Sequence, residues 1–162
     1  MPLYKINEKS PYKVTLMGEN SYAFTTDQGT NYEIGFVEDF MLGIDNVYQF
    51  FIEANGSAGK AKDPKIAETV FAVLEEFFQN GNLILDYICD TSDGRHEARS
   101  RLFSQWYNHH PLKIGFTMQR IFAKFEGEGY YAAVILRNDN PKYGECITAI
   151  DAFSKDILDK LK

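Results

Sequence analysis

The sequence is poor in cysteine, and its two cysteines do not form a recognisable pair. Cys89 and Cys146 lie 57 positions apart in a chain of 162 residues, which matches neither a disulfide framework nor a Cys-x-x-Cys motif. Free thiols are typical of reducing compartments, and the N-terminal stretch has no apolar segment of the signal-peptide type. These features predict a cytoplasmic protein.

Long apolar runs and excess positive charge are also missing. No apolar run approaches the roughly 20 residues that a membrane-spanning helix needs. The formal net charge is −6, which is unfavourable for a general nucleic-acid binder. We therefore expect neither a membrane nor a nucleic-acid partner.

Motifs for metals, nucleotides and common hydrolases are absent from the sequence. The three histidines, His96, His109 and His110, do not have the spacing of a metal site with each other or with the cysteines. There is no Walker-type loop, no Gly-x-Gly-x-x-Gly fingerprint and no Gly-x-Ser-x-Gly elbow. We predict no metal and no cofactor. A Ser-His-Asp triad stays open, because its members need no fixed spacing.

Apolar and aromatic residues are abundant instead. The apolar fraction is 44% and the aromatic fraction is 15%, so the acidic chain is too aromatic to be disordered. A chain of this length fits one domain, which would bury roughly 70% of its unfolded surface. We predict a single globular domain over residues 1–162.

The first half of the chain reads as strands followed by a helix. Alternating apolar residues predict a strand that places Tyr12, Val14 and Leu16 on one face, a hairpin over 21–36 and a strand over 46–54. Asp63 as N-cap and Pro64 at the first helical position open a helix, and Gly81 is its expected stop.

The second half alternates between strands and helices. The apolar run 82–89 predicts a strand covered on both faces, and a helix is expected over 95–108. Two further strands surround the turn at 126–129, the first with a bulge near Gln119 and Arg120 where the apolar parity changes. Asn140 and Pro141 open a last helix. The order β-β-β-β-α-β-α-β-β-α predicts an α+β fold, a mostly antiparallel sheet of about six or seven strands with three helices.

The segment YICDTSDGRHEAR, residues 87–99, contains the most suggestive spacing. Five residues separate Cys89 from Arg95, as in cysteine-dependent phosphatases, where a thiolate attacks phosphorus and an arginine grips the phosphate. Asp90 and Asp93 would oppose a bound phosphate and a lowered thiol pKa. His96 stands where that motif usually has Ser or Thr. We interpret Cys89 as a small buried thiol, with catalysis by Cys89 and Arg95 as the alternative.

Arg95 and Arg99 are better candidates for a functional role. At 100° per residue both fall on the apolar stripe of the predicted helix, where a guanidinium needs a partner. One interpretation is internal, with Arg99 bridged to Asp86 or Asp90. The other is that the helix start holds an anionic ligand or a partner's carboxylate. The candidate binding residues are Asp90, Asp93, Arg95, His96, Arg99 and Trp106.

The same corner carries a family resemblance. The segment YICDTSDGRHEARSRLFSQWY and the earlier SYAFTTDQGTNYEIGF resemble the two recognisable blocks of an uncharacterised bacterial family of small proteins, a domain of unknown function. The resemblance extends over nearly the whole chain and is weakest at 54–62 and in the C-terminal third. Its pattern maps onto Asp90, Asp93, Arg99, Arg101, Phe103 and Trp106. The resemblance implies one domain and supplies no activity, cofactor or catalytic residue.

The sequence therefore favours a non-catalytic intracellular binding or interaction module. Its partner would be an unidentified protein or a small anionic ligand, and a homodimer through exposed aromatics is a further expectation. A cysteine-dependent phosphoryl-transfer enzyme using Cys89 and Arg95 is the alternative from another class. A purely structural or assembly subunit is the third.

Overall fold

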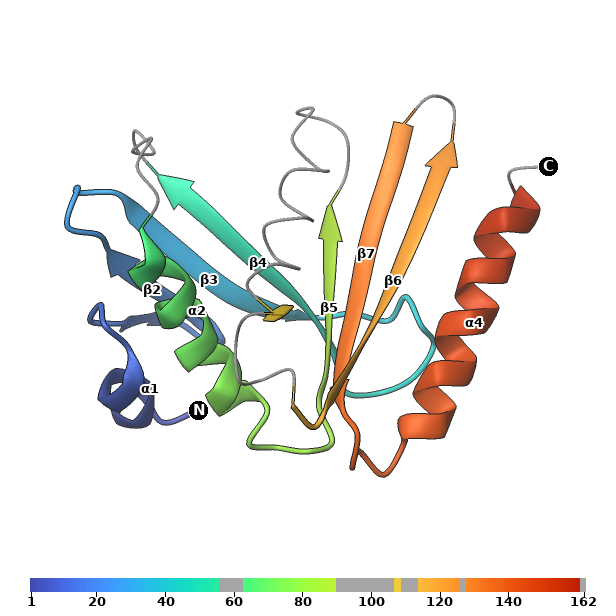
Figure 1. The fold of residues 1–162 in the computed structure, drawn as a ribbon, viewed down its shortest axis with the longest axis horizontal. Coiled ribbons are helices and arrows are strands. Elements are labelled where there is room, and N and C mark those ends of the chain that lie inside the picture. The colour runs from blue at the N-terminus through green and yellow to red at the C-terminus, as the bar shows by residue number, and fades with distance from the viewer. Residues whose placement is uncertain (56–62, 90–106, 109–113, 126–127, 161–162) are drawn as a thin grey trace. The chain divides into compact units, whose positions relative to one another are not determined.

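A computed structural model describes residues 1–55, 63–89, 107–108, 114–125 and 128–160 of the chain (Figure 1). In these ranges the chain forms three helices and a seven-stranded, mostly antiparallel sheet, which confirms the predicted α+β class. The elements are α1 (Leu3–Lys9), β1 (Thr15–Gly18), β2 (Ser21–Thr25), β3 (Asn31–Glu38), β4 (Val47–Asn55), α2 (Pro64–Phe77), β5 (Ile84–Cys89), β6 (Phe116–Phe125), β7 (Glu128–Arg137) and α4 (Tyr143–Lys160).

The strand order in the sheet is β1-β2-β3-β4-β5-β7-β6. Strands β4 and β5 are parallel, with Val47 opposite Ile84 and Gln49 opposite Asp86. The pairs β1–β2, β2–β3, β5–β7 and β6–β7 are antiparallel. The chain divides into two compact units, residues 1–37 with 50–80 and residues 38–49 with 81–162. The prediction of one domain stays a prediction.

In the first unit, the predicted hairpin is confirmed. β2 and β3 pair antiparallel from Ser21–Gly35 to Thr25–Asn31, and Gly29 in the connecting turn has φ +81°, a conformation that glycine adopts without strain. The inward side chains Tyr22, Phe24, Ile34 and Phe36 are buried. The turn residues and the alternation of apolar with polar side chains were sufficient to predict this hairpin.

Helix α2 begins as predicted but ends earlier. Asp63 accepts a hydrogen bond from the Lys65 N–H, and Pro64 occupies the first turn. The helix ends at Phe77 rather than near Gly81. Phe77 and Phe78 are both buried and their rings meet edge to face at 5.0 Å. The helix therefore ends where two consecutive aromatic side chains are buried, four residues before Gly81.

The N-terminal region differs from prediction in two respects. Tyr12 and Val14 are buried, but Leu16 is 58% exposed on the short edge strand β1. All four residues of β1 are exposed at the edge of the sheet, so the alternation of buried residues at Tyr12 and Val14 does not continue into this strand. The short helix α1 was not predicted, because seven residues with Ile6 as the buried contact give too little periodicity.

In the second unit, β6 and β7 form a long antiparallel hairpin without the predicted bulge. The register runs without a shift from Phe116–Arg137 to Phe125–Glu128. The change of apolar parity has another cause. Ala133 to Leu136 of β7 are all buried, so both faces of β7 are covered there, whereas Gln119 and Arg120, where the apolar parity of β6 changes, are exposed.

Helix α4 covers an apolar cluster of the second unit and lies beside β6 (Figure 1). The Asn140 side chain accepts a hydrogen bond from the Lys142 N–H at the helix start, and Cys146 and Ile150 are buried as the pattern predicted. The buried members of the cluster are Leu42, Val47, Ile84, Ile121, Val134, Leu136, Cys146 and Ile150. Among the described helices, none is long and apolar enough to cross a membrane.

Candidate functional site

Strand β5 leads directly into the predicted corner. It ends at Cys89, whose register partner is Tyr131 of β7. The candidate residues Asp90, Asp93, Arg95, His96, Arg99 and Trp106 lie outside the described residues, and so does most of the predicted helix 95–108. Its last residues, Tyr107 and Asn108, are helical, and Tyr107 is 7% exposed. The corner therefore starts at the carboxyl end of a strand that is parallel to its neighbour.

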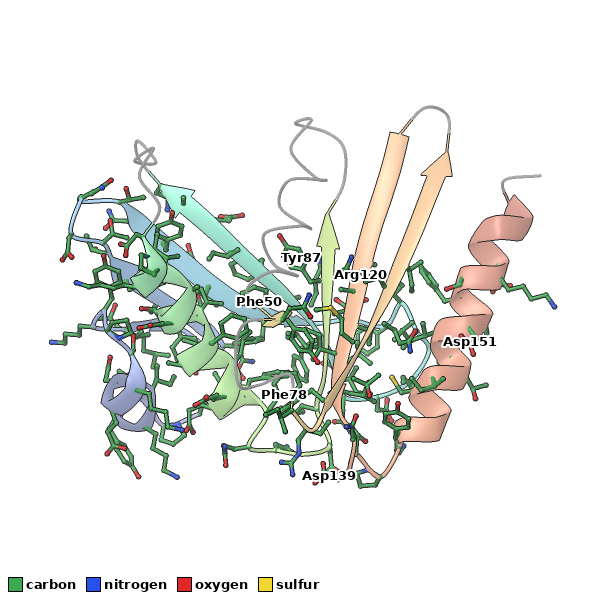
Figure 2. The ribbon with its side chains drawn as sticks, viewed as in Figure 1. Phe50, Phe78, Tyr87, Arg120, Asp139 and Asp151 are labelled. Carbon is green, nitrogen blue, oxygen red and sulfur yellow. The ribbon has the colours of Figure 1, made fainter. Side chains whose placement is uncertain are left out.

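Arg120 of β6 lies level with Tyr87 of β5, two residues before β5 ends at Cys89. Ala133 of β7 is the register partner of both Tyr87 on β5 and Arg120 on β6. Partners in register project from the same face, so Tyr87 and Arg120 share a face about 10 Å apart across two strands (Figure 2). The Arg120 side chain is exposed and has no ion pair or hydrogen bond within the described ranges. An exposed guanidinium in this position is available to an anion.

Asp86 is the charged residue within the otherwise apolar strand β5. It is completely buried, and its register partners are Gln49 and Val134. Neither carboxylate oxygen receives a hydrogen bond from any described residue. An ionised carboxylate without donors in an apolar core is strongly unfavourable, so this group must be neutralised.

Asp39 supplies the neighbouring group. It follows β3, and its Oδ1 accepts a hydrogen bond from the Met41 N–H at 2.9 Å, whereas its Oδ2 is buried without a donor among the described residues. Burial and, after it, the Asp39 side chain, as hydrogen-bond partner of the protonated acid and as a negative charge, together raise the pKa of Asp86 to about 8. A protonated Asp86 can donate a hydrogen bond to Asp39, which satisfies one oxygen of each group.

The carboxyl pair is unsuited to direct catalysis as it stands. Asp86 is 0% exposed, so a substrate cannot contact it in this conformation. Within the described residues no cluster of three or more metal-binding side chains exists. Cys146 is likewise buried, and burial raises the pKa of its thiol to about 11, which leaves it unreactive at neutral pH.

A second polar cluster lies in the first unit and has a different character. The Tyr12 hydroxyl donates to Asp63 Oδ2 and accepts from the Asp27 N–H at 3.3 Å. Asp63 Oδ1 caps helix α2 through the Lys65 N–H at 3.0 Å, and Lys65 Nζ pairs with Asp27 at 3.0 Å. Each group finds a complementary partner, so the cluster joins a hairpin turn to a helix start and is structural.

Sequence reasoning identified Asp86 as a charged strand residue but missed Asp39 and Arg120. Asp86 carried a signal, since an aspartate inside an apolar strand needs an explanation. Asp39 carried none, because an acidic residue after a strand is ordinary. Arg120 was assigned to a bulge that does not exist. The bridge predicted between Arg99 and Asp86 involves a residue outside the described ranges and stays a prediction.

Comparison with known proteins places the corner inside a family match. None of the proteins with curated descriptions matches this chain. A family model described as a family of unknown function, DUF6169, matches residues 62–154. That range includes the corner block and begins after the N-terminal hairpin block, so the match is shorter than the sequence resemblance suggested. Because the match spans more than half of the chain, the protein belongs to the DUF6169 family.

Proposed function

We propose that the protein is a cytoplasmic binding module that takes a small anionic ligand, or a carboxylate of a partner protein, at the corner formed by residues 90–99. The recognition residues would be Arg95, His96 and Arg99 at the predicted helix start. Arg120 contributes from the neighbouring part of the sheet. Trp106 is the nearby aromatic.

The observation that carries this proposal is the exposed Arg120, which has no ion pair or hydrogen bond with the residues that the structure describes. It shares a face and a row with Tyr87, two residues before β5 ends at Cys89. β5 pairs in parallel with β4 over Ile84 to Asp86 and antiparallel with β7 up to Cys89, so the corner follows the carboxyl end of a strand in a mixed sheet. A cation on the sheet beside such a strand end supports an anionic ligand over a cationic or apolar one.

The raised pKa of Asp86 bears on the internal alternative for Arg99. A carboxyl group that keeps its proton at neutral pH, because its pKa is raised to about 8, supplies no negative charge to an arginine. Asp86 is then a poor internal partner for Arg99. The positive charge of Arg99 is correspondingly more available to a ligand.

The test is an anion titration followed by the fluorescence of Trp106, the single tryptophan of the chain. Inorganic phosphate and citrate are the probes, with sodium chloride matched in ionic strength to remove general screening. We expect a saturable change with phosphate or citrate. Arg99→Ala and Arg120→Gln should each weaken binding about 10-fold to 100-fold, the loss of one charge-assisted contact.

Lys155→Gln, which removes one exposed cation from helix α4, is the matched control and should bind as the wild type does. Thermal unfolding of Arg99→Ala decides the role of that residue. Lost binding at nearly unchanged stability supports a ligand site, and a large loss of stability indicates internal pairing. Equal responses of all variants, or no saturable response to either anion, would contradict the proposal.

Cysteine-dependent phosphoryl transfer is the second candidate, favoured by one observation. β5 ends at Cys89, and its first three residues pair in parallel with β4, which matches in part the parallel strand that precedes the anion-binding loop of such enzymes. Alkylation of Cys89 by iodoacetamide in a Cys146→Ser variant tests it. A midpoint well below the usual pKa of about 8.5 for a free thiol, with protection by phosphate, would favour the enzyme. A thiol that is inert until unfolding would exclude it.

A further inference from the structure

The segment 39–46, which connects β3 to β4, is attached to the sheet of the second unit by a small number of contacts. The Asp39 N–H donates to the Val47 carbonyl at 2.8 Å, and the Ile84 N–H donates to the Asn46 carbonyl at 2.8 Å. Leu42 is buried in the apolar cluster, and two half-buried side chains pack against it, Met41 and Ile44. The attachment therefore depends on apolar packing and on the interactions of the Asp39 side chain.

The Asp39 side chain meets the one buried charge-bearing group of β5. Asp86 is fully buried, and neither of its oxygens has a donor among the described residues. Asp39 Oδ2 is buried and equally without a donor there. Two ionised carboxylates at this position would repel each other in an apolar environment, whereas one proton between them makes a hydrogen bond that ties segment 39–46 to the strand.

The surroundings of Asp86 supply no alternative neutralising charge within the described part of the chain. Its neighbours on the same face of the sheet are neutral, with Gln49 on β4, Val134 on β7 and Gln119 on β6. On helix α4 the thiol of Cys146 is buried and protonated at neutral pH, because burial raises its pKa to about 11. Among the side chains of α4 and the segment whose burial is described, the other titratable groups are exposed or half-buried, namely Asp45, Tyr143, Glu145, Asp151, Lys155 and Asp156.

We propose that Asp39 and Asp86 form a protonation-dependent latch, in which one shared proton holds segment 39–46 against β5 and loss of that proton releases the segment. Release would expose Leu42, Met41 and Ile44, which now pack on the cluster beneath α4. Opening costs the burial of these side chains, so the latch should open locally before the second unit unfolds.

The latch is favoured over two other functions of the same pair. Complete burial of Asp86 excludes contact with a substrate in the closed state. A bound metal ion would need further ligands, and no described group of three such side chains exists. A proton shared by the two carboxyl groups needs no further ligand. The burial of Asp86 beside Asp39, which raises the pKa of Asp86 to about 8, places the opening above neutral pH.

Methyl NMR of the full chain tests the latch directly. The reporters are the Met41 ε-methyl and the Ile44 δ-methyl, and Ile34, buried in the first unit, is the control. Between about pH 6 and about pH 10, on either side of the pKa of about 8, we expect both reporters to move toward solvent-exposed shifts with a common midpoint. Ile34 should not follow. Reporters that stay fixed over this range would overturn the latch.

Two variants identify the groups responsible. Asp86→Asn keeps the shape and donates to Asp39 at any pH, so the reporters should show no transition. Asp39→Asn removes the repelling charge and offers an amide donor, so the midpoint should move to lower pH. An unchanged midpoint in both variants would overturn the assignment. Restoration of the closed shifts at high pH by millimolar Ca²⁺ would mean a metal site instead of a proton latch.

Discussion

The two polar clusters of this protein differ in how their hydrogen-bonding groups are satisfied. In the first unit, Tyr12 is 6% exposed and connects Asp63 to Asp27, with a donor for each acceptor. In the second unit, Asp39 Oδ2 and both carboxylate oxygens of Asp86 are buried with no donor among the described residues. In the first cluster the protein groups satisfy one another's hydrogen bonds, whereas the second needs an added proton to form a hydrogen bond between its two carboxyl groups.

This difference shows where each cluster should respond to its environment. A cluster of complementary partners contributes steadily as long as the Tyr12 hydroxyl keeps its proton. The hydrogen bond to Asp63, together with burial, raises the pKa of Tyr12 above its ordinary value of 10.0, so no change is expected from this tyrosine near neutrality. The carboxyl pair, in contrast, should titrate inside the physiological range. The contribution of the tyrosine cluster to stability should therefore be constant near neutral pH, whereas that of the carboxyl pair should depend on pH.

The largest expected effect is a pH-dependent loss of stability that Asp86→Asn abolishes. The folded pKa of Asp86 is about 8 and its ordinary value is 3.8, so between about pH 4 and about pH 8 the folded state holds a proton that the unfolded state has released. Stability should therefore fall as pH rises through this window, by up to about 1.4 kcal/mol per pH unit. At pH 7 we expect Asp86→Asn to be more stable than the wild type by on the order of 3 kcal/mol.

Urea unfolding of both proteins at several pH values measures this effect. The stability difference between variant and wild type should grow with pH and level off above the folded pKa of Asp86. Parallel pH profiles would show that Asp86 ionises normally in the folded protein, and the contrast between the two clusters would then disappear.

Asp63→Ala should give the largest loss in the tyrosine cluster. It removes the N-cap of α2 and the acceptor of the Tyr12 hydroxyl together, which should cost about 2 kcal/mol. Asp63→Asn retains one acceptor oxygen, which can still cap the helix, and replaces the oxygen that accepts from Tyr12 by an amide NH2 group; it is the control, with a smaller loss. The free energy of unfolding in urea is the measurement, and equal losses for the two variants would mean that the carboxylate charge matters more than the cap.

Tyr12→Phe should cost about 1 kcal/mol, the net value of one hydrogen-bonded hydroxyl. The ring contact with Phe24, at 5.8 Å between centroids, is retained, so packing is little disturbed. Because the pKa of Tyr12 is raised, the wild type should also lose stability above about pH 10, where unfolded tyrosine ionises, and the variant should lose less. Thermal unfolding on both sides of that pH tests the assignment, and identical alkaline losses would contradict it.

Lys65→Met should give the smallest effect, below about 0.5 kcal/mol. The Lys65–Asp27 ion pair is at 3.0 Å, but its side chains are 51% and 73% exposed. Denaturant unfolding at low and high salt tests this, since any contribution should vanish with screening. A salt-independent loss above about 1 kcal/mol would show that the contact of Lys65 with the Tyr12 ring carries the energy instead.

The sequence was a good guide wherever structure is set locally. The 21–36 hairpin, the Asp63–Pro64 helix start and the apolar strand ending at Cys89 follow from turn residues, caps and alternation. The edge position of Leu16 and the unbroken register of β6 were missed, because they depend on which strands are neighbours.

The candidate site was even harder to predict from local sequence patterns. Asp39 and Asp86 are 47 positions apart and meet through the pairing of β4 with β5, which no local pattern reveals. Arg120 joins the row of Tyr87 only through the order β5-β7-β6. From the sequence, Asp86 was named only as a possible bridging partner of Arg99, and a second carboxyl group beside it was not considered.

The central claim is that Asp86 is a protonated acid paired with Asp39 in the folded protein at neutral pH. The most direct test is the ¹³C chemical shift of the Asp86 carboxyl carbon as a function of pH, assigned by comparison with Asp86→Asn. We predict a shift typical of a carboxylic acid at pH 7 and a titration midpoint near a pKa of about 8, which moves down in Asp39→Asn. A carboxylate shift at pH 7, with a midpoint below about 5 as in exposed aspartates, would contradict the account.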